Sequence, residues 1–360
     1  MSAAETSVLA LLRDPARAPT FRADDWNRAL PALRRHGLTA RVTRDARLAG
    51  VLDDVVPAAR RHLSAAEALA DHRRTAALAE ITRVQEALAV EKVPFVLLKG
   101  AAYVAAEAEA GRGRLFEDVD VLVAEADLLA AERGLMRAGW APERLNAYDT
   151  RYYRRWMHQV PPLIHTERGS VVDLHHGLLP RTSRLQVDAA SVRRDARPLA
   201  RWPGASLPRP ADLLLHSALH ALMQEDVASA LRDLVDMDRL VRAHQDDAAF
   251  ADRLQQHAGW PDAAATLALA FDLMAAFLAT PVCQPVARAV SAGRRPYLAA
   301  QLFRTALSTQ PEPPVRSALA ASALFVRGHH LKMPLTLLIR HIAHKALRSP
   351  AGSREPVGDR

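Results

Sequence analysis

The chain has 360 residues, a formal net charge of +8 and a single cysteine, Cys283. This length supports one elaborated domain or two domains, and one cysteine excludes both an intramolecular disulfide and a cysteine-based zinc site. Aromatic residues make up only 5% of the chain, while alanine and leucine supply most of its apolar mass, which favours helices over a β-sandwich or barrel.

The N-terminal sequence and the net charge suggest the cellular location of the protein and the kind of partner it binds. Met1–Arg13 has no basic stretch followed by a long apolar core, so we expect no signal peptide. No uninterrupted apolar run reaches the roughly 18 residues of a membrane-spanning helix, and we therefore expect a cytoplasmic, reduced protein. The positive charge comes almost entirely from scattered arginines. It is compatible with an RNA or another anionic partner, and equally with a biased genome composition.

Apolar residues at helical spacing recur through residues 1–74, which predicts a helical N-terminal region. A clearer helix is expected from Thr75 to Val90. Its apolar face consists of residues that recur every three or four positions, namely Leu78, Ile81, Val84 and Leu88.

The segment from Val93 to Val123 places charged groups at the ends of two predicted strands. The apolar run Val93–Leu98 ends at Lys99-Gly100, where a helix is expected to begin. The next strand opens with Asp118 and Asp120, which point to one face because strand side chains alternate. Crowded carboxylates repel each other unless a cation lies between them, and hard ions such as Mg²⁺ take oxygen ligands.

Lys99 and Gly100 offer the complementary site for an anion. Glycine permits close approach to the backbone, and the free N–H groups at a helix start favour negative charge. A compact ammonium suits contact with a phosphate, although a solvated charge at a strand end is the plainer interpretation of Lys99. A cation site beside an anion site is the layout needed to bind a nucleoside triphosphate.

A further helix, Glu125–Ala138, leads to a polar stretch at residues 148–158 in which aromatic residues alternate with arginines. Such a stretch can stack bases, but it is also common at sheet edges. A β-hairpin is predicted over Leu163–His176, with Asp173 near the end of its second arm. A buried aspartate there would need a partner; the alternative is an unpaired surface aspartate.

Four motifs stand in a fixed order along this part of the chain: Leu98-Lys99-Gly100, Arg114, Asp118-Val119-Asp120 and Asp173-Leu174-His175. In this combination the chain resembles a bacterial family of uncharacterised nucleotidyltransferases, over roughly residues 70 to 245. More widely, it resembles the DNA polymerase β-type nucleotidyltransferase superfamily. The resemblance implies that Asp118, Asp120 and Asp173 hold divalent ions, and that Lys99, Gly100 and Arg114 bear on the phosphates of a nucleotide.

The same resemblance implies an α+β fold, with a small mixed β-sheet core of the nucleotidyltransferase type flanked by helical regions. We expect an N-terminal helical region at 1–74, the core at 75–205, a C-terminal helical domain at 206–348 and a disordered tail at 349–360. Residues 180–210, rich in proline and arginine, are expected to form an irregular connection. The basic amphipathic stretch 335–347 predicts a closing helix, with membrane-surface docking as the alternative.

Two helices are expected after this connection, at about 213–223 and 227–242. His216 and His220 lie four residues apart on the first, a spacing that can bind zinc, but the zinc-protease pattern would need glutamate where Ser217 stands. Packing or hydrogen bonding is therefore the favoured role of both histidines. Arg232, on the second helix, could reach a phosphate or pair with Asp233 beside it.

These observations predict a metal-dependent transfer of a nucleoside monophosphate from a nucleoside triphosphate to a hydroxyl group. Mg²⁺ or Mn²⁺ would serve, as two ions about 4 Å apart, and ATP is the default donor because it is abundant. The acceptor is expected on a small molecule, peptide or protein rather than on RNA, and to bind near residues 148–158 and the helices after Pro210.

Two alternatives stay open at this point. The wider superfamily has Gly-Gly or Gly-Ser at the strand-to-helix turn, whereas this chain has Lys99-Gly100-Ala101. The chain could therefore be a nucleotide-binding or antitoxin-like protein without turnover. An Asp-x-Asp glycosyltransferase is less favoured, because only one clear strand precedes Asp118.

Overall fold

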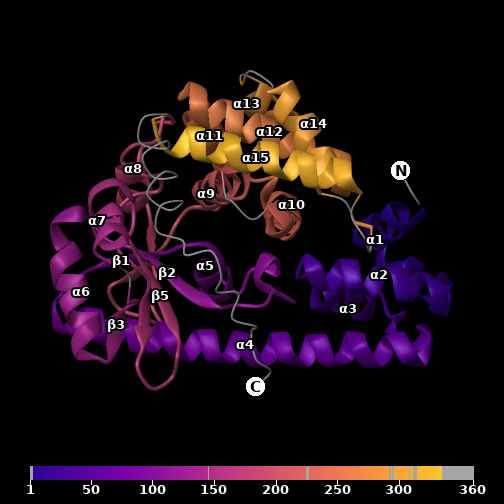
Figure 1. Ribbon diagram of the computed structural model, residues 1–360, viewed down its shortest axis with the longest axis horizontal. Helices are drawn as coiled ribbons and strands as arrows, with labels where there is room; N and C mark the ends of the chain where they lie inside the picture. Colours follow the sequence, from indigo (N-terminus) through magenta and orange to yellow (C-terminus); the bar gives the residue numbers. More distant parts are fainter. Residues whose placement is uncertain are drawn as a thin grey trace, which may run out of the picture.

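The computed structural model of the protein describes residues 3–144, 146–223, 227–291, 293, 296–307, 309–310 and 314–334. It confirms the predicted α+β fold, with a mixed sheet flanked by helices (Figure 1). The sheet lies at the left of Figure 1, the long helix α4 runs beneath it, and the later helices lie above. The predicted closing helix at 335–347 and the tail at 349–360 lie outside the described residues.

The sheet has seven described strands in the order β3-β4-β5-β2-β1-β7-β6. Their bounds are β1 Phe95–Leu97, β2 Asp118–Leu122, β3 Trp140–Pro142, β4 Leu163–His165, β5 Val171–His175, β6 Arg197–Pro198 and β7 Ala205–Leu207. β2 is parallel to β5 and β1 is parallel to β7, while the other neighbours are antiparallel. The predicted hairpin is confirmed as the pair β4–β5.

The N-terminal residues are helical, as predicted. The helices are α1 Ala3–Arg13, α2 Ala23–Arg35, α3 Thr39–Leu48 and α4 Pro57–Val90, with short 3-10 turns η1 Pro15–Thr20 and η2 Leu52–Asp54. The helix expected from Thr75 is the second half of α4, which is 34 residues long and begins at Pro57. Proline suits this first helical position, because its missing N–H would have no partner there. The sequence prediction placed the start too late because the first half of α4 is rich in alanine and buries only Ala59, Leu63 and Ala70, so it shows no strong apolar face.

Helices and turns of the middle of the chain pack around the sheet. They are α5 Lys99–Ala105, η3 Glu109–Gly111, η4 Glu125–Asp127, α6 Leu128–Arg137, α7 Ala147–Trp156 and α8 Ala189–Arg194. The aromatic and basic stretch considered for a sheet edge is therefore mostly the helix α7. The connection expected at 180–210 is also more ordered than predicted, since it contains α8, β6 and β7, and β7 extends the sheet beside β1.

The C-terminal part is helical, as predicted. Its elements are α9 Pro210–Met223, η5 Val227–Ser229, α10 Ala230–His244, α11 Ala248–Ala258, α12 Pro261–Leu278, α13 Gln284–Ser291, α14 Tyr297–Ala306 and α15 Val315–Lys332. Among the described residues, α12 is long and apolar enough to cross a membrane by length and composition, although Asp262 and Asp272 interrupt its apolar sequence. This is weak support for a span, because 61% of that segment is buried inside the protein and core helices meet the same criterion.

One cluster of buried apolar side chains runs through all three predicted regions. It joins Val8 and Leu63 of the N-terminal helices to Val121 of the sheet, and continues to Leu214 and Phe303. The boundary predicted at 74/75 falls inside α4, and the one at 205/206 falls inside β7. The division of the chain into these regions stays a prediction.

Candidate active site

The register of β2 and β5 brings the three predicted carboxylates together. The two strands are parallel, and Asp120 lies directly beside Asp173. Asp118 stands two residues before Asp120, so its side chain shares that face. Asp118 and Asp173 line one cavity of about 250 Å³, and Asp120 lies beneath, only 1% exposed.

The negative charges at this site are not fully balanced. Repulsion from Asp120 together with burial raises the pKa of Asp118 to about 6, and burial together with repulsion from Asp120 and Asp118 raises the pKa of Asp173 to about 7. One oxygen of Asp173, Oδ1, is buried without a hydrogen-bond partner among the described residues. A carboxylate oxygen left in this state is suited to a cation, because the cation would supply the missing contact.

The donor atoms present fit a divalent metal ion. One ligand atom each from Asp120, Asp173 and His175 lie within 4.8 Å of one another. Carboxylate oxygens suit Mg²⁺ and Mn²⁺, and an imidazole nitrogen is accepted more readily by Mn²⁺ than by Mg²⁺. Asp118 is outside this group of three, although it borders the same cavity.

Sequence reasoning noticed His175 in the motif but gave it no role. It lies two residues after Asp173, so strand alternation alone places both side chains on one face. Its Nε2 lies 2.9 Å from Oδ1 of Asp120, and its ring is fully buried. The structure thus gives His175 a direct contact with Asp120, which the spacing of Asp-x-His on a strand could have indicated.

Lys99 lies against the carboxylates rather than in open solvent. Its Nζ donates a hydrogen bond of 2.7 Å to Oδ1 of Asp120. Burial alone would lower the pKa of Lys99, but the charges of Asp120 and Asp118 outweigh burial and raise it. Burial likewise opposes ionisation of Asp120, yet Lys99 and His175 hold the pKa of this carboxyl well below its usual range. Lys99 also lines the cavity, where it is placed to meet an anion.

Gly100 is required by packing. A Cβ atom added at this position would lie 2.9 Å from Cδ1 of Phe116, closer than real Cβ contacts come. The glycine thus lets α5 approach the segment that leads into β2. The predicted close approach of a phosphate to Gly100 stays a prediction.

Arg114 joins the loop before β2 to helix α10. It forms an ion pair with Asp236 and lies 3.9 Å from Asp233, while its guanidinium stands over the ring of Tyr103 at 5.7 Å. Arg41 of α3 reaches the same Asp236 at 3.1 Å. Arg114 is thus paired with protein carboxylates, and its predicted contact with a phosphate stays a prediction.

Arg232 is paired with its neighbour, as the plainer of the two sequence interpretations held. Its Nε lies 3.4 Å from Oδ1 of Asp233. The side chain is 25% exposed, so it contributes to a network that also contains Arg114. Its predicted contact with a phosphate stays a prediction.

Histidines also line the cavity that Asp118 and Asp173 border. His216 and His220 of α9 line it, together with His158 from the segment after α7. Burial lowers the pKa of His158 and His216 well below the usual value, and Nδ1 of each is buried without a partner among the described residues. The regions expected to bind the acceptor thus do border the cavity, through Met157–Gln159 and through α9.

A model of a protein family described as "Uncharacterised nucleotidyltransferase" matches residues 22–279. The match covers well over half of the chain and includes every residue of the site described above. The chain belongs to this nucleotidyltransferase family. No curated protein and no solved structure matches the chain.

Membership of the nucleotidyltransferase family extends further along the chain than the sequence motifs indicated. The match begins in the loop before α2 and ends just after α12, beyond the expected range of residues 70 to 245 at both ends. Arg41 lies inside this longer range and supports Asp236 from the N-terminal side. The helices that carry the catalytic candidates and those that brace them are therefore part of one family unit.

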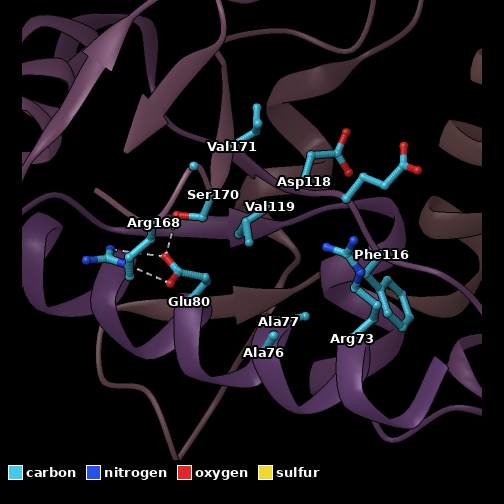
Figure 2. A pocket seen from close by; sticks show the side chains of 12 residues that line it. Arg73, Ala76, Ala77, Glu80, Phe116, Asp118, Val119, Arg168, Ser170 and Val171 are labelled. Carbon is cyan, nitrogen blue, oxygen red and sulfur yellow. Dashed lines mark hydrogen bonds and ion pairs between the residues drawn. The ribbon is translucent and has the colours of Figure 1, made fainter. Parts of the chain in front are cut away.

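A second recess of about 290 Å³ meets the site of this nucleotidyltransferase from the side of α4 (Figure 2). Asp118 lines both this recess and the cavity that holds Lys99. At its other end, Glu80 accepts hydrogen bonds of 2.9 Å from Arg168 Nε and from Ser170 Oγ, drawn in Figure 2. Asp118 is thus accessible from two directions.

Proposed function

We propose that the protein transfers a nucleoside monophosphate from a nucleoside triphosphate, by default ATP, to a hydroxyl group. Family membership supports nucleotidyl transfer as the class of reaction. One observation supports this site as the place of the reaction. Oδ1 of Asp173 is buried beside Asp120 without a hydrogen-bond partner among the described residues, at the border of a cavity that Lys99 also lines. A kinship with DNA polymerase β-type enzymes is part of the proposal and is supported by the three carboxylates on the neighbouring strands β2 and β5.

The residues divide into those that hold a metal ion and those that hold phosphate. Asp120, Asp173 and His175 would hold Mg²⁺ or Mn²⁺, with Asp118 beside them. When bound, the ion neutralises charge on the α-phosphate and lowers the pKa of an oxygen that attacks it. Lys99 lies where it can turn from Asp120 toward a phosphate oxygen and stabilise the departing pyrophosphate.

The size and lining of the site limit the acceptor. A cavity of about 250 Å³ matches a small molecule or one side chain of a peptide or protein better than a folded RNA. Aromatic residues of the stretch considered for base stacking pack on one another, as Tyr152 does on Trp156 with ring centroids 5.7 Å apart. We therefore favour a small molecule, peptide or protein as the source of the hydroxyl.

A thermal-shift panel tests the proposal without knowledge of the acceptor. ATP, GTP, CTP and UTP are each added with Mg²⁺ or Mn²⁺ to the wild type and to Asp173→Asn. A ligand at a hundredfold excess over its Kd stabilises the native state by about 2.7 kcal/mol. We expect a metal-dependent rise in Tm with at least one triphosphate, lost in Asp173→Asn. The absence of any shift with all four would overturn the proposal.

Turnover separates an enzyme from a nucleotide-binding protein. The triphosphate that gives the largest shift is incubated with the wild type, and pyrophosphate release is followed with water and glycerol as hydroxyl acceptors. Release that requires both the metal and Asp173 supports transfer. A shift without any release would instead support a nucleotide-binding role without turnover.

A further inference from the structure

A histidine backed by a carboxylate lines the same cavity as Asp118 and Asp173. His220 is near the end of α9, and its Nδ1 lies 3.4 Å from Oδ2 of Asp233 on α10. Asp233 is 5% exposed, whereas the side chain of His220 is 36% exposed because it opens into the cavity. The two residues thus form a pair with a buried acid and an accessible imidazole.

The other oxygen of Asp233 is held by arginines. Oδ1 lies 3.4 Å from Nε of Arg232 and 3.9 Å from Nη2 of Arg114. Burial would raise the pKa of Asp233, but His220, Arg114 and Arg232 outweigh burial and hold it below its usual range. Asp233 is therefore ionised, and an ionised carboxylate only accepts hydrogen bonds.

This fixes the tautomer of His220. Nδ1 must carry the hydrogen that faces Asp233, so Nε2 carries the lone pair. Enclosure within the protein and the charge of Lys99 lower the pKa of His220, which keeps the ring neutral and able to take a proton. Neither His158 nor His216, the other described histidines that line the cavity, has a partner for Nδ1 among the described residues, so the ring of each lacks this constraint.

We propose that His220, oriented by Asp233, is the general base that takes the proton of the acceptor hydroxyl. This rests on the proposed function. The acceptor O–H bond breaks and its proton moves to Nε2 of His220. The acceptor oxygen forms a bond to the α-phosphorus, and the bond from that phosphorus to the β-phosphate oxygen breaks, so that pyrophosphate leaves with the electron pair. Arg114 and Arg232 are positioning residues, because they act through Asp233.

The proposed role of His220 gives a function to the carboxylate contacts of Arg114 and Arg232, two arginines that the sequence predicted at a phosphate. Arg114 was expected at a phosphate, yet it lies beside Asp233 and Asp236. Arg232 was expected at a phosphate, yet it lies beside Asp233. Both arginines thus support the proposed base through Asp233.

The test uses the full chain with Mg²⁺ or Mn²⁺ and the triphosphate identified by thermal shift, with pyrophosphate release measured in water and glycerol. For His220→Ala we expect kcat to fall by about 10²-fold or more, the typical size of a general-base contribution. KM for the triphosphate and its thermal shift should stay within about threefold of the wild type. Asp233→Asn should also lower kcat, since an amide can no longer fix the tautomer.

Free imidazole distinguishes a base from a residue that only supports the fold. Imidazole in solution should restore part of the activity of His220→Ala, and substituted imidazoles of higher pKa should restore more. His176→Ala is the matched control: this histidine is half-buried beside Arg181 and Glu125 rather than in the cavity. Imidazole should leave the activity of His176→Ala and of the wild type unchanged.

The outcomes separate this inference from the function on which it rests. Wild-type release together with a His220→Ala kcat within about threefold of wild type overturns the role of His220 alone. The role of His220 is also overturned if His220→Ala loses turnover, keeps the thermal shift with the triphosphate and regains no activity with imidazole. A wild type that binds no triphosphate and releases no pyrophosphate overturns the proposed function, and the base with it.

Discussion

The ionised carboxylate of Asp173 lowers the stability of the folded protein, although its unpaired oxygen is suited to a cation. Its Oδ1 is buried without a partner among the described residues, and its neighbour across the strands is another carboxylate, Asp120. Its folded-state pKa, about 7, lies above the ordinary value of an aspartate, so the ionised form is less favourable in the folded protein. The cost appears above pH of about 4 and is complete above pH of about 7.

Asp173→Asn should therefore stabilise the protein when metal is absent. We expect the free energy of unfolding at pH 7.5 to rise by roughly 1–3 kcal/mol in EDTA, since the amide carries no charge. The gain should shrink toward pH 4 and should also shrink when Mn²⁺ stabilises the wild type. Urea denaturation with and without EDTA measures this. Glu117→Gln is the control: Glu117 is exposed and directly precedes β2, so this substitution should change the free energy of unfolding little. An Asp173→Asn protein less stable than the wild type in EDTA would contradict the argument.

At the scale of elements, α9 is anchored to α11 by a buried ion pair. Asp212, in the first turn of α9, is fully buried and accepts hydrogen bonds of 2.7 Å from Arg253 and 2.6 Å from His257. Burial would raise the pKa of Asp212, but the bonds from His257 and Arg253 outweigh burial and lower it. Because α9 also carries His216 and His220, this anchor helps to hold one wall of the cavity.

The anchor predicts a pH-dependent stability with a definite sign. A carboxyl whose folded-state pKa is depressed stabilises the fold above its unfolded pKa of about 3.9, and this contribution is lost as the pH falls through the folded-state value. Asp212→Asn should cost about 1–3 kcal/mol at pH 7, because Arg253 loses one of its two carboxylate partners and keeps only Asp195, 3.0 Å away.

Urea denaturation between pH 7 and pH 3 measures the prediction for Asp212. The difference between Asp212→Asn and the wild type should narrow below pH of about 4. Asp252→Asn, an exposed aspartate on α11, serves as the control and should show little effect at any pH. A difference that stays constant down to pH 3 would argue against the ionised pair.

At the scale of the whole molecule, the N-terminal helices brace the site from outside the sheet. Arg41 of α3 is 2% exposed and donates hydrogen bonds of 2.6 Å to the carbonyl oxygens of Glu109 and Ala110, as well as reaching Asp236. Asp236 in turn pairs with Arg114. The loop before β2 and helix α10 are thus joined through a residue near position 40.

A fragment that starts at residue 75 should therefore not fold as a stable unit. It would cut α4 in half, leave Asp236 without Arg41, and leave Arg239 without Asp45. We expect a fragment of residues 75–348 to show no cooperative thermal transition and rapid proteolysis, whereas residues 22–348, which keep α2 to α4, should retain one. A cooperative transition for the shorter fragment would show that the boundary at 74/75 separates independent domains.

The sequence by itself determined most of the helices and the strands that carry the three carboxylates, and the family resemblance of its motifs implied the α+β class. Period-two alternation placed Asp118 and Asp120 on one face, and a strand pattern ending in Asp-x-His placed Asp173, because these are local properties of the chain. A short apolar run predicted the strand before Lys99, and helical spacing together with breaks at glycine and proline predicted the helices. The sequence could not locate β7, whose role depends on pairing with β1 about 110 residues earlier.

Only the tertiary structure decided what the charged side chains do. The carboxylate partners of Lys99 and Arg114 depend on which elements pack beside them, and no local pattern encodes that. The parallel register of β2 and β5 set Asp120 beside Asp173, and the packing of α9 on α10 set Asp233 behind His220. The sequence specifies which side chains are charged. Long-range packing decides which of them form pairs, because it brings residues more than 100 positions apart into contact.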